Sequence, residues 1–195
     1  MKKIIVLILV SLSITYGQIP KLGEAKGLFL STSVGPRIPL GQFSDTNNPG
    51  SGFDVGISYS DNILIPFFLN LSIGYTHFPG RQELYSSSDY SSFSSNMITI
   101  TFGGRYYGTP LMENVILLMP VFDCSLLMGN FYDYHQYKLG SGKEDHWENY
   151  SKFGIQAGAG FSTFLFDIMA YYNYLPGHNY FSFDIRARIP IFVQM

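Results

Sequence analysis

The feature that most limits the fold of this chain is a strict alternation of apolar and polar residues. It is clearest near the C-terminus, where residues 181 to 192 read FSFDIRARIPIF. Successive side chains of a β-strand point to opposite faces, so this stretch predicts a strand with one fully apolar face. The other face carries charged residues at every second position, namely Asp184, Arg186 and Arg188. Any fold proposed for the chain must therefore keep these three charged side chains away from an apolar environment or pair them with opposite charges.

The same alternation recurs along the chain after residue 17, where no stretch is long and apolar enough to be a transmembrane helix. Eight strands are predicted in all. They cover residues 27–39, 53–60, 67–76, 98–107, 115–129, 153–162, 168–174 and 181–192. The clear runs are about 9 to 11 residues long, which is the length a tilted strand needs to cross a bilayer.

The connections between these strands alternate in length. Short links are predicted at residues 60–65, 108–114 and 166–168, and longer polar loops at 40–51, 77–96, 130–150 and 175–179. An even number of antiparallel strands, with tight turns at one end and long loops at the other, is typical of outer-membrane barrels. We therefore predict an all-β fold, an eight-stranded antiparallel up-and-down transmembrane β-barrel. The serine-rich stretch 84–96 is predicted to be a flexible loop.

The N-terminus predicts export. Residues 1–17 have two lysines, a short apolar run and small residues before Gln18, the three-part layout of a secretory signal peptide. The barrel domain is then expected at 18–195, in the outer membrane of a Gram-negative-type bacterium. Without the two lysines the formal charge changes from −2 to −4, which argues against a nucleic-acid partner. Cys124 is the single cysteine, so no internal disulfide can form, and its strand position predicts that it faces lipid.

Charged residues make up only 13% of the chain, against about 25% in a typical soluble domain. Side chains of a barrel alternate between lipid and interior, and a charge facing lipid near the midplane costs about 2–4 kcal/mol. The inward positions then hold four arginines and four aspartates, predicted to form an interior salt-bridge network. They are Arg37, Asp54, Arg105, Asp123, Asp167, Asp184, Arg186 and Arg188. Eight strands leave only enough interior for such side chains, so an open pore is not expected.

With these features the chain resembles the outer membrane protein beta-barrel domain family, the small eight-stranded OmpX-like and opacity-like proteins. The residues that carry the resemblance are GPRIPLGQFSD (35–45), GFDVGISYS (52–60) and FSFDIRARIPIF (181–192). It covers nearly all of the mature chain and implies the barrel fold. Such proteins often end on an aromatic residue that the barrel-assembly machinery recognises. This chain ends Val193-Gln194-Met195, and its nearest aromatic residue is Phe192.

We predict no catalytic residue, no metal site and no cofactor. The stretch HNYFS (178–182) offers a histidine and a serine, but a hydrolase also needs a carboxylate behind the histidine, and none is close in sequence. A metal site from Asp133, His135, Asp145 and His146 would match no compact ligand spacing. The loop 130–150 is rich in aromatic residues, and its candidate contact residues are Tyr132, Tyr134, Tyr137 and Trp147. The favoured alternative is a membrane-interface belt with a hairpin above it.

The expected function is therefore that of a non-enzymatic outer-membrane barrel with a structural or surface-interaction role through its long loops. One alternative is narrow, porin-like transport of small solutes, and a less favoured one is a lipid-modifying barrel enzyme. The expected partners are outer-membrane lipids, the barrel-assembly machinery during insertion, and a protein or surface ligand at the loops.

Overall fold

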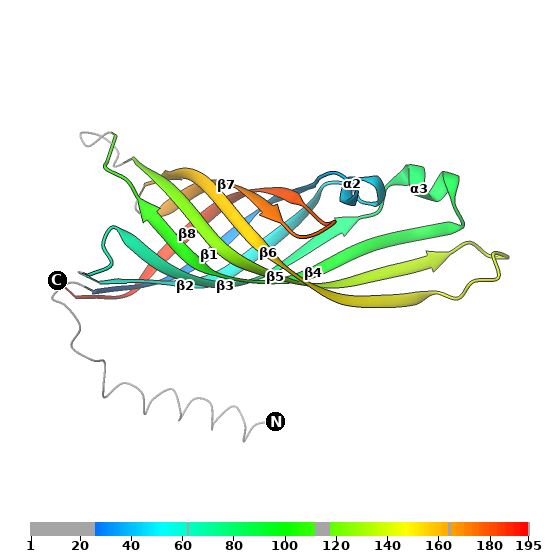
Figure 1. The fold of residues 1–195 in the computed structure, drawn as a ribbon, viewed down its shortest axis with the longest axis horizontal. Helices are drawn as coiled ribbons and strands as arrows, with labels where there is room; N and C mark the ends of the chain where they lie inside the picture. Colours follow the sequence, from blue (N-terminus) through cyan, green and yellow to red (C-terminus); the bar gives the residue numbers. More distant parts are fainter. Residues whose placement is uncertain (1–25, 62, 112–117, 164, 195) are drawn as a thin grey trace, which may run out of the picture.

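The structure is a computed structural model that describes residues 26–194 apart from 62, 112–117 and 164. The predicted signal peptide lies outside the described residues. Eight strands and two short helices follow one another along the chain (Figure 1). They are β1 (Lys26–Pro39), α2 (Phe43–Thr46), β2 (Gly50–Asp61), β3 (Phe67–Pro79), α3 (Gln82–Ser87), β4 (Tyr90–Tyr107), β5 (Met119–Tyr137), β6 (His146–Ser162), β7 (Phe166–Tyr174) and β8 (Tyr180–Gln194).

The strands form a closed barrel in which each pairs antiparallel with its neighbours in sequence. β1 closes the ring by pairing with β8, with Val34 opposite Ile185. The predicted fold, an all-β, eight-stranded up-and-down barrel, is confirmed. Closure satisfies the backbone of every strand within the barrel wall, so no strand edge is left open along that wall. Among the described residues, no helix has the length and apolar character needed to cross a bilayer.

The alternation of the sequence becomes an apolar outside and a polar inside. On β8, Ile185 is 61% exposed whereas Asp184, its neighbour, is 3% exposed. Each of the eight strands exposes large apolar side chains in this way. Aromatic pairs lie near both ends of this apolar band: Phe53 with Tyr75 and Tyr172 with Phe181 at the loop end, and Phe67 with Tyr106 at the turn end. An apolar band between two aromatic girdles is the outer surface of a membrane barrel.

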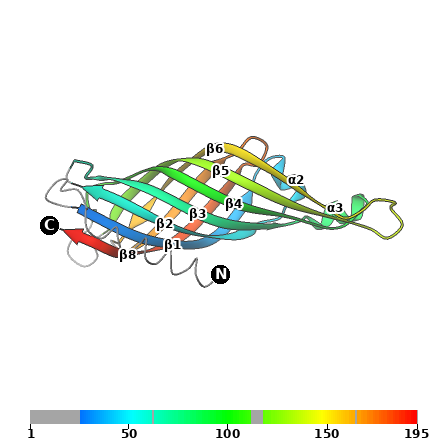
Figure 2. The ribbon, with the colours of Figure 1, turned by 90° about the horizontal axis from the view of Figure 1, so that it is seen from below.

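Three strands extend beyond the rest of the barrel at the loop end. β4, β5 and β6 protrude past the rim, and the β5–β6 hairpin reaches farthest (Figures 1 and 2). β6 pairs with β7 only from Ile155 onward, so residues 146–154 pair with β5 alone. We call the part of β4–β6 above this rim the protruding sheet.

The protruding sheet corrects two predicted loops. Most of 130–150 forms paired strands, and the serine-rich stretch 84–96 forms the end of α3 and the start of β4. The prediction ended these strands where the outward apolar residues end. Pairing continues because the inward side chains still pack: Phe131 is 1% exposed, and Ser95 donates a hydrogen bond to Asp133.

Chemical labelling of Cys124 can test which face of β5 meets lipid. It is exposed on the outer face between Phe122 and Leu126. In intact membranes, a membrane-impermeant thiol reagent should label Cys124 poorly, because hydrocarbon covers this face. As a positive control, an Asn149→Cys protein that also carries Cys124→Ala should label rapidly, because Asn149 is exposed on the protruding sheet. Equally rapid labelling of both cysteines would contradict the orientation.

Candidate functional site

Arg37 holds the upper of two ion-pair groups inside the barrel. Its Nη2 lies 2.8 Å from Asp54 Oδ2 on β2, and its Nη1 lies 2.6 Å from Asp184 Oδ1 on β8. The arginine therefore joins β1 to both of its neighbours. Gly74 on β3 makes room for this group, since a Cβ atom there would lie 2.0 Å from Asp54 Oδ1. Only glycine fits such a close approach without displacing the carboxylate.

Arg105 holds the second group, nearer the turn end. The Nη2 atom of Arg105 lies 2.8 Å from Asp123 Oδ2 and its Nη1 lies 3.2 Å from Asp167 Oδ2. The same guanidinium donates to the hydroxyl of Tyr171 at 3.0 Å. Arg188 approaches the other oxygen of Asp167 at 3.2 Å and donates to the hydroxyl of Tyr107 at 2.7 Å. Arg105 is 1% exposed, so these charges depend on one another rather than on bulk water.

Arg186 differs from the expectation. It lies inside the barrel with the other predicted charges, but its guanidinium carbon lies 5.9 Å from the ring centroid of Tyr171, in cation–π geometry. The ion pairs of the described interior use Arg37, Arg105 and Arg188, so the prediction that Arg186 neutralises an interior aspartate is not supported. Arg186 and Asn70 line a small polar cavity of about 10 Å³, space for about one water molecule.

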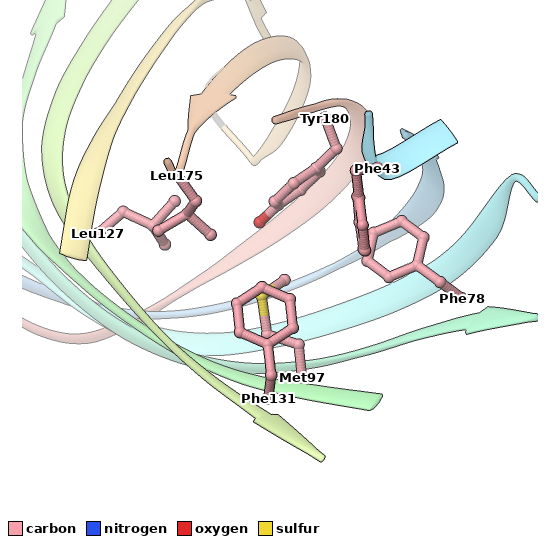
Figure 3. Close-up of a cluster of buried hydrophobic side chains, with 7 residues drawn as sticks. All are labelled: Phe43, Phe78, Met97, Leu127, Phe131, Leu175 and Tyr180. Atoms are coloured by element: carbon pink, nitrogen blue, oxygen red, sulfur yellow. The ribbon is translucent and has the colours of Figure 1, made fainter. Parts of the chain in front are cut away.

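A cluster of apolar side chains fills the mouth of the barrel above the Arg37 group. Its seven residues are Phe43, Phe78, Met97, Leu127, Phe131, Leu175 and Tyr180. Figure 3 shows Phe43 entering from α2 and facing Phe78, and the two ring centroids are 4.8 Å apart. At the other end Tyr107, Val121, Met169 and Tyr171 form a second apolar cluster. This second cluster packs beside the Arg105 group, since Tyr171 accepts from Arg105 and Tyr107 accepts from Arg188.

A chain of hydrogen bonds borders the mouth cluster. Ser95 donates to Asp133 Oδ1 at 2.5 Å, and Tyr150 donates to Asp133 Oδ2 at 2.7 Å. The Tyr150 hydroxyl also lies 2.8 Å from His178 Nε2. Because its one proton is directed at Asp133, Tyr150 accepts from a protonated Nε2. Burial, and then the hydrogen bond to Asp133, raise the pKa of Tyr150, which keeps its proton.

This order of groups does not form a nucleophile. The serine donates directly to the carboxylate, and the histidine is three hydrogen bonds away from the serine. An activated serine needs the histidine beside it. Ser182, the serine singled out with His178 in the sequence, accepts a hydrogen bond from Asn173 instead. The arrangement ties β4, β5, β6 and the 175–179 loop together at the rim.

The four residues considered for a metal are also spread over different contacts. Asp133 belongs to the chain described above, and Asp145 accepts from the backbone of Tyr137 at 2.8 Å. The rings of His135 and His146 stack in parallel with centroids 4.7 Å apart. Among the described residues, no group of three histidine, cysteine or acidic side chains is placed to hold a metal ion.

The four candidate contact residues lie on strands and on two different faces. Tyr132, Tyr134 and Trp147 point outward, and the Tyr134 and Trp147 ring centroids are 4.7 Å apart. Tyr137 belongs to the opposite face, where it stacks on Tyr90 with centroids 4.9 Å apart. The four residues therefore do not form one surface, because the side chains of a strand alternate.

The sequence did not predict that the mouth of the barrel would be closed by residues of the connecting segments. Phe43, Tyr150 and His178 come from three segments predicted as loops, and their contacts join residues far apart in the chain. The available signal was the continued alternation of 131–137, where Phe131, Asp133 and His135 keep the inward phase of the preceding strand.

Comparison with known proteins gives structural neighbours only. No family model and no curated protein matches the chain. Neisserial surface protein A has 13% identity and a TM-score of 0.45, over 85% of this chain and 97% of that one. Ail, the attachment invasion locus protein of Yersinia pestis, crystallised with the heparin analogue sucrose octasulfate, has 14% identity and a TM-score of 0.41, over 86% of this chain and 100% of that one. The N-terminal barrel domain of Pseudomonas aeruginosa OprF has 12% identity and a TM-score of 0.41, over 85% and 99%. Values this low carry no argument, so the fold rests on the strand pairing of the chain itself.

Replacing Arg105 should destabilise the barrel far more than replacing Arg186. Arg105→Met leaves Asp123 without its arginine and Asp167 with Arg188 alone, and removing one member of a buried pair costs about 3–5 kcal/mol. Arg186→Met removes only a ring contact, worth about 2 kcal/mol or less. Urea titration of both variants in liposomes measures the free energy of unfolding, with Ile185→Ala on the outer face as the control. The assignment is wrong if Arg186→Met proves the more damaging change.

The mouth should become less stable at acid pH because of His178. Burial, and then the nearby Lys152, lower the pKa of His178 below its ordinary value of 6.5. The unfolded chain therefore takes up a proton at a higher pH than the folded protein. The free energy of unfolding is then at its full value above about pH 6.5 and falls as the pH drops toward the pKa of the folded state.

Urea titrations at about pH 7.5 and about pH 5.5 measure this dependence. His178→Gln should lose less stability over that interval than the wild-type protein, because glutamine does not titrate. Tyr150, Asp133 and Lys152 remain in the variant, so the surroundings of residue 178 are matched in the two proteins. Identical losses in the two proteins would refute the role of His178.

Proposed function

We propose that this protein is an integral outer-membrane barrel that acts as a surface-contact protein through its protruding sheet. The apolar band and its aromatic ends support insertion in a bilayer. The loop end carries the long strands, and in outer-membrane barrels the longer connections are extracellular. The protruding sheet would then stand outside the cell, where a partner can reach it.

The observation that carries this proposal is the unpaired edge of β6. Residues 146–154 hydrogen-bond with β5 on one side, and none of the described strands pairs with them on the other. Lys152 covers the lower part of this edge, since its Nζ donates to the backbone oxygen of Pro176 at 2.7 Å. The upper part, from His146 to Ser151, presents backbone groups on which an extended segment of another protein can add as a strand.

The packed interior supports contact rather than transport. A solute on its way through the barrel would have to displace the mouth cluster, the ion-paired arginines and the second apolar cluster. The cavity between them holds about one water molecule. A catalytic role gains no support from the order of Ser95, Asp133, Tyr150 and His178.

The proposal predicts a partner that depends on the protruding sheet. A photoreactive residue at Asn149 should cross-link to a protein in intact cells, whereas the same residue at Ile168, on the outer apolar face, should not. Replacing residues 134–147 by an Asn-Gly turn shortens the hairpin, because Tyr134 is paired with Trp147. A probe at Asn149 in this shortened protein should lose the adduct.

Unboiled and boiled samples on a denaturing gel provide the folding control. Both the wild-type and the shortened protein should migrate differently before and after boiling, because the barrel below the rim is unchanged. Identical migration, with the protein in a soluble fraction, would refute insertion. A folded barrel that gives no adduct at Asn149 would refute the contact function alone.

A further inference from the structure

The outer face of the protruding sheet has an unusual composition. Its residues are aromatic, amide or hydroxyl-bearing, and none is charged: Ser94, Asn96, Asn130, Tyr132, Tyr134, Gln136, Trp147, Asn149 and Ser151. We call this the uncharged face. The opposite face of the same strands carries Asp133, His135, Glu148 and Lys152. The two faces of the protruding sheet therefore differ in charge. The uncharged face is the more exposed of the two, although exposed faces usually carry the charged residues.

The polar groups of the uncharged face are partly organised. Tyr75 on β3 donates to Asn96 Oδ1 at 2.7 Å, and Ser151 donates to Asn130 Oδ1 at 2.7 Å. Asn149 is exposed, and its amide has no side-chain hydrogen bond within the described part of the chain. Trp147 is 58% exposed and Tyr132 is 38% exposed. Open ring faces thus lie beside amides that can both donate and accept hydrogen bonds.

This face continues directly from the lipid-facing band. Toward the loop end, the outward residues of β4, β5 and β6 change from apolar to polar between one outward position and the next. Ile98 is followed by Asn96 on β4, Met128 by Asn130 on β5, and Phe153 by Ser151 on β6. A bilayer that covers the apolar band places its headgroups at this change. The uncharged face therefore stands where lipid headgroups end.

From this continuity and chemistry we infer that the uncharged face binds the sugar headgroup of a glycolipid in the same membrane leaflet. The inference rests on the membrane insertion proposed above. Sugar rings present C–H faces that pack on aromatic rings, and hydroxyl groups that pair with amides and hydroxyls. Phosphate headgroups instead attract lysine and arginine, and this face has neither. The sugar ring, rather than the charge of the lipid, is then the recognised group.

The single tryptophan of the chain makes this testable. Trp147 is on the uncharged face, so intrinsic tryptophan fluorescence reports on that face alone. The barrel is placed in nanodiscs of phosphatidylethanolamine and phosphatidylglycerol, with or without a galactosyl diacylglycerol. With the galactolipid, Trp147 emission should shift to shorter wavelength and its quenching by acrylamide should fall. Tyr132→Ser and Tyr134→Ser should each reduce both changes, and Tyr137→Ser, on the opposite face, should leave them intact.

The other outcomes overturn the inference. Equal emission in nanodiscs with and without the galactolipid means that the face does not recognise sugar. A response to free methyl galactoside in sugar-free nanodiscs as large as that to the galactolipid means that the ligand is a soluble glycan rather than a membrane lipid. The boiled and unboiled gel samples separate these results from failed insertion: a heat-modifiable barrel without a Trp147 response leaves the contact proposal standing and removes this one.

Discussion

A backbone amide or carbonyl surrounded by hydrocarbon has to find its hydrogen-bond partner within the protein, and the rest of this structure depends on that requirement. β-Strands can meet it only in a closed ring, which is why β1 pairs with β8. Closure in turn creates a narrow interior, cut off from lipid, that every second residue must fill. Charged residues are tolerated there because Arg37 and Arg105 each bind two carboxylates. The mouth cluster then covers these charges at the loop end, and the second cluster packs among them nearer the turn end.

The same requirement is relaxed above the rim, where water replaces hydrocarbon. β6 can keep an unpaired edge there, and the outward face no longer needs to be apolar. Each of the two proposed activities depends on one of these features, the unpaired edge or the polar outward face. The edge offers backbone groups to a protein strand, and the uncharged face offers rings and amides to sugars. A membrane-bound sugar and a partner strand would then approach the sheet from different sides.

Prediction from sequence succeeded where apolar residues on one face of a strand alternated with charged residues on the other face. The phase of β8 followed directly from Asp184, Arg186 and Arg188, because a reversed strand would expose three charges to lipid. It failed above the rim, where both faces of β5 and β6 are mixed and the strands looked like a loop. It also could not assign partners within the interior. Whether Arg186 meets an aspartate or Tyr171 depends on how far each side chain reaches across the barrel, which the order of residues does not contain.

One ion pair of the interior joins the first and the last strand, because Arg37 and Asp184 are separated by 147 positions. The Arg37–Asp184 and Arg188–Asp167 pairs cannot form before the last strand is in place. Until then Asp184 and Arg188 have no interior partner, and they interrupt the apolar run of their own strand. For a chain that crosses an aqueous compartment before it reaches its membrane, this has a benefit, because charges within strands discourage aggregation. The residues that lock the finished barrel thus also protect the chain in transit, and Asp184 and Arg188 exchange the second task for the first when the ring closes.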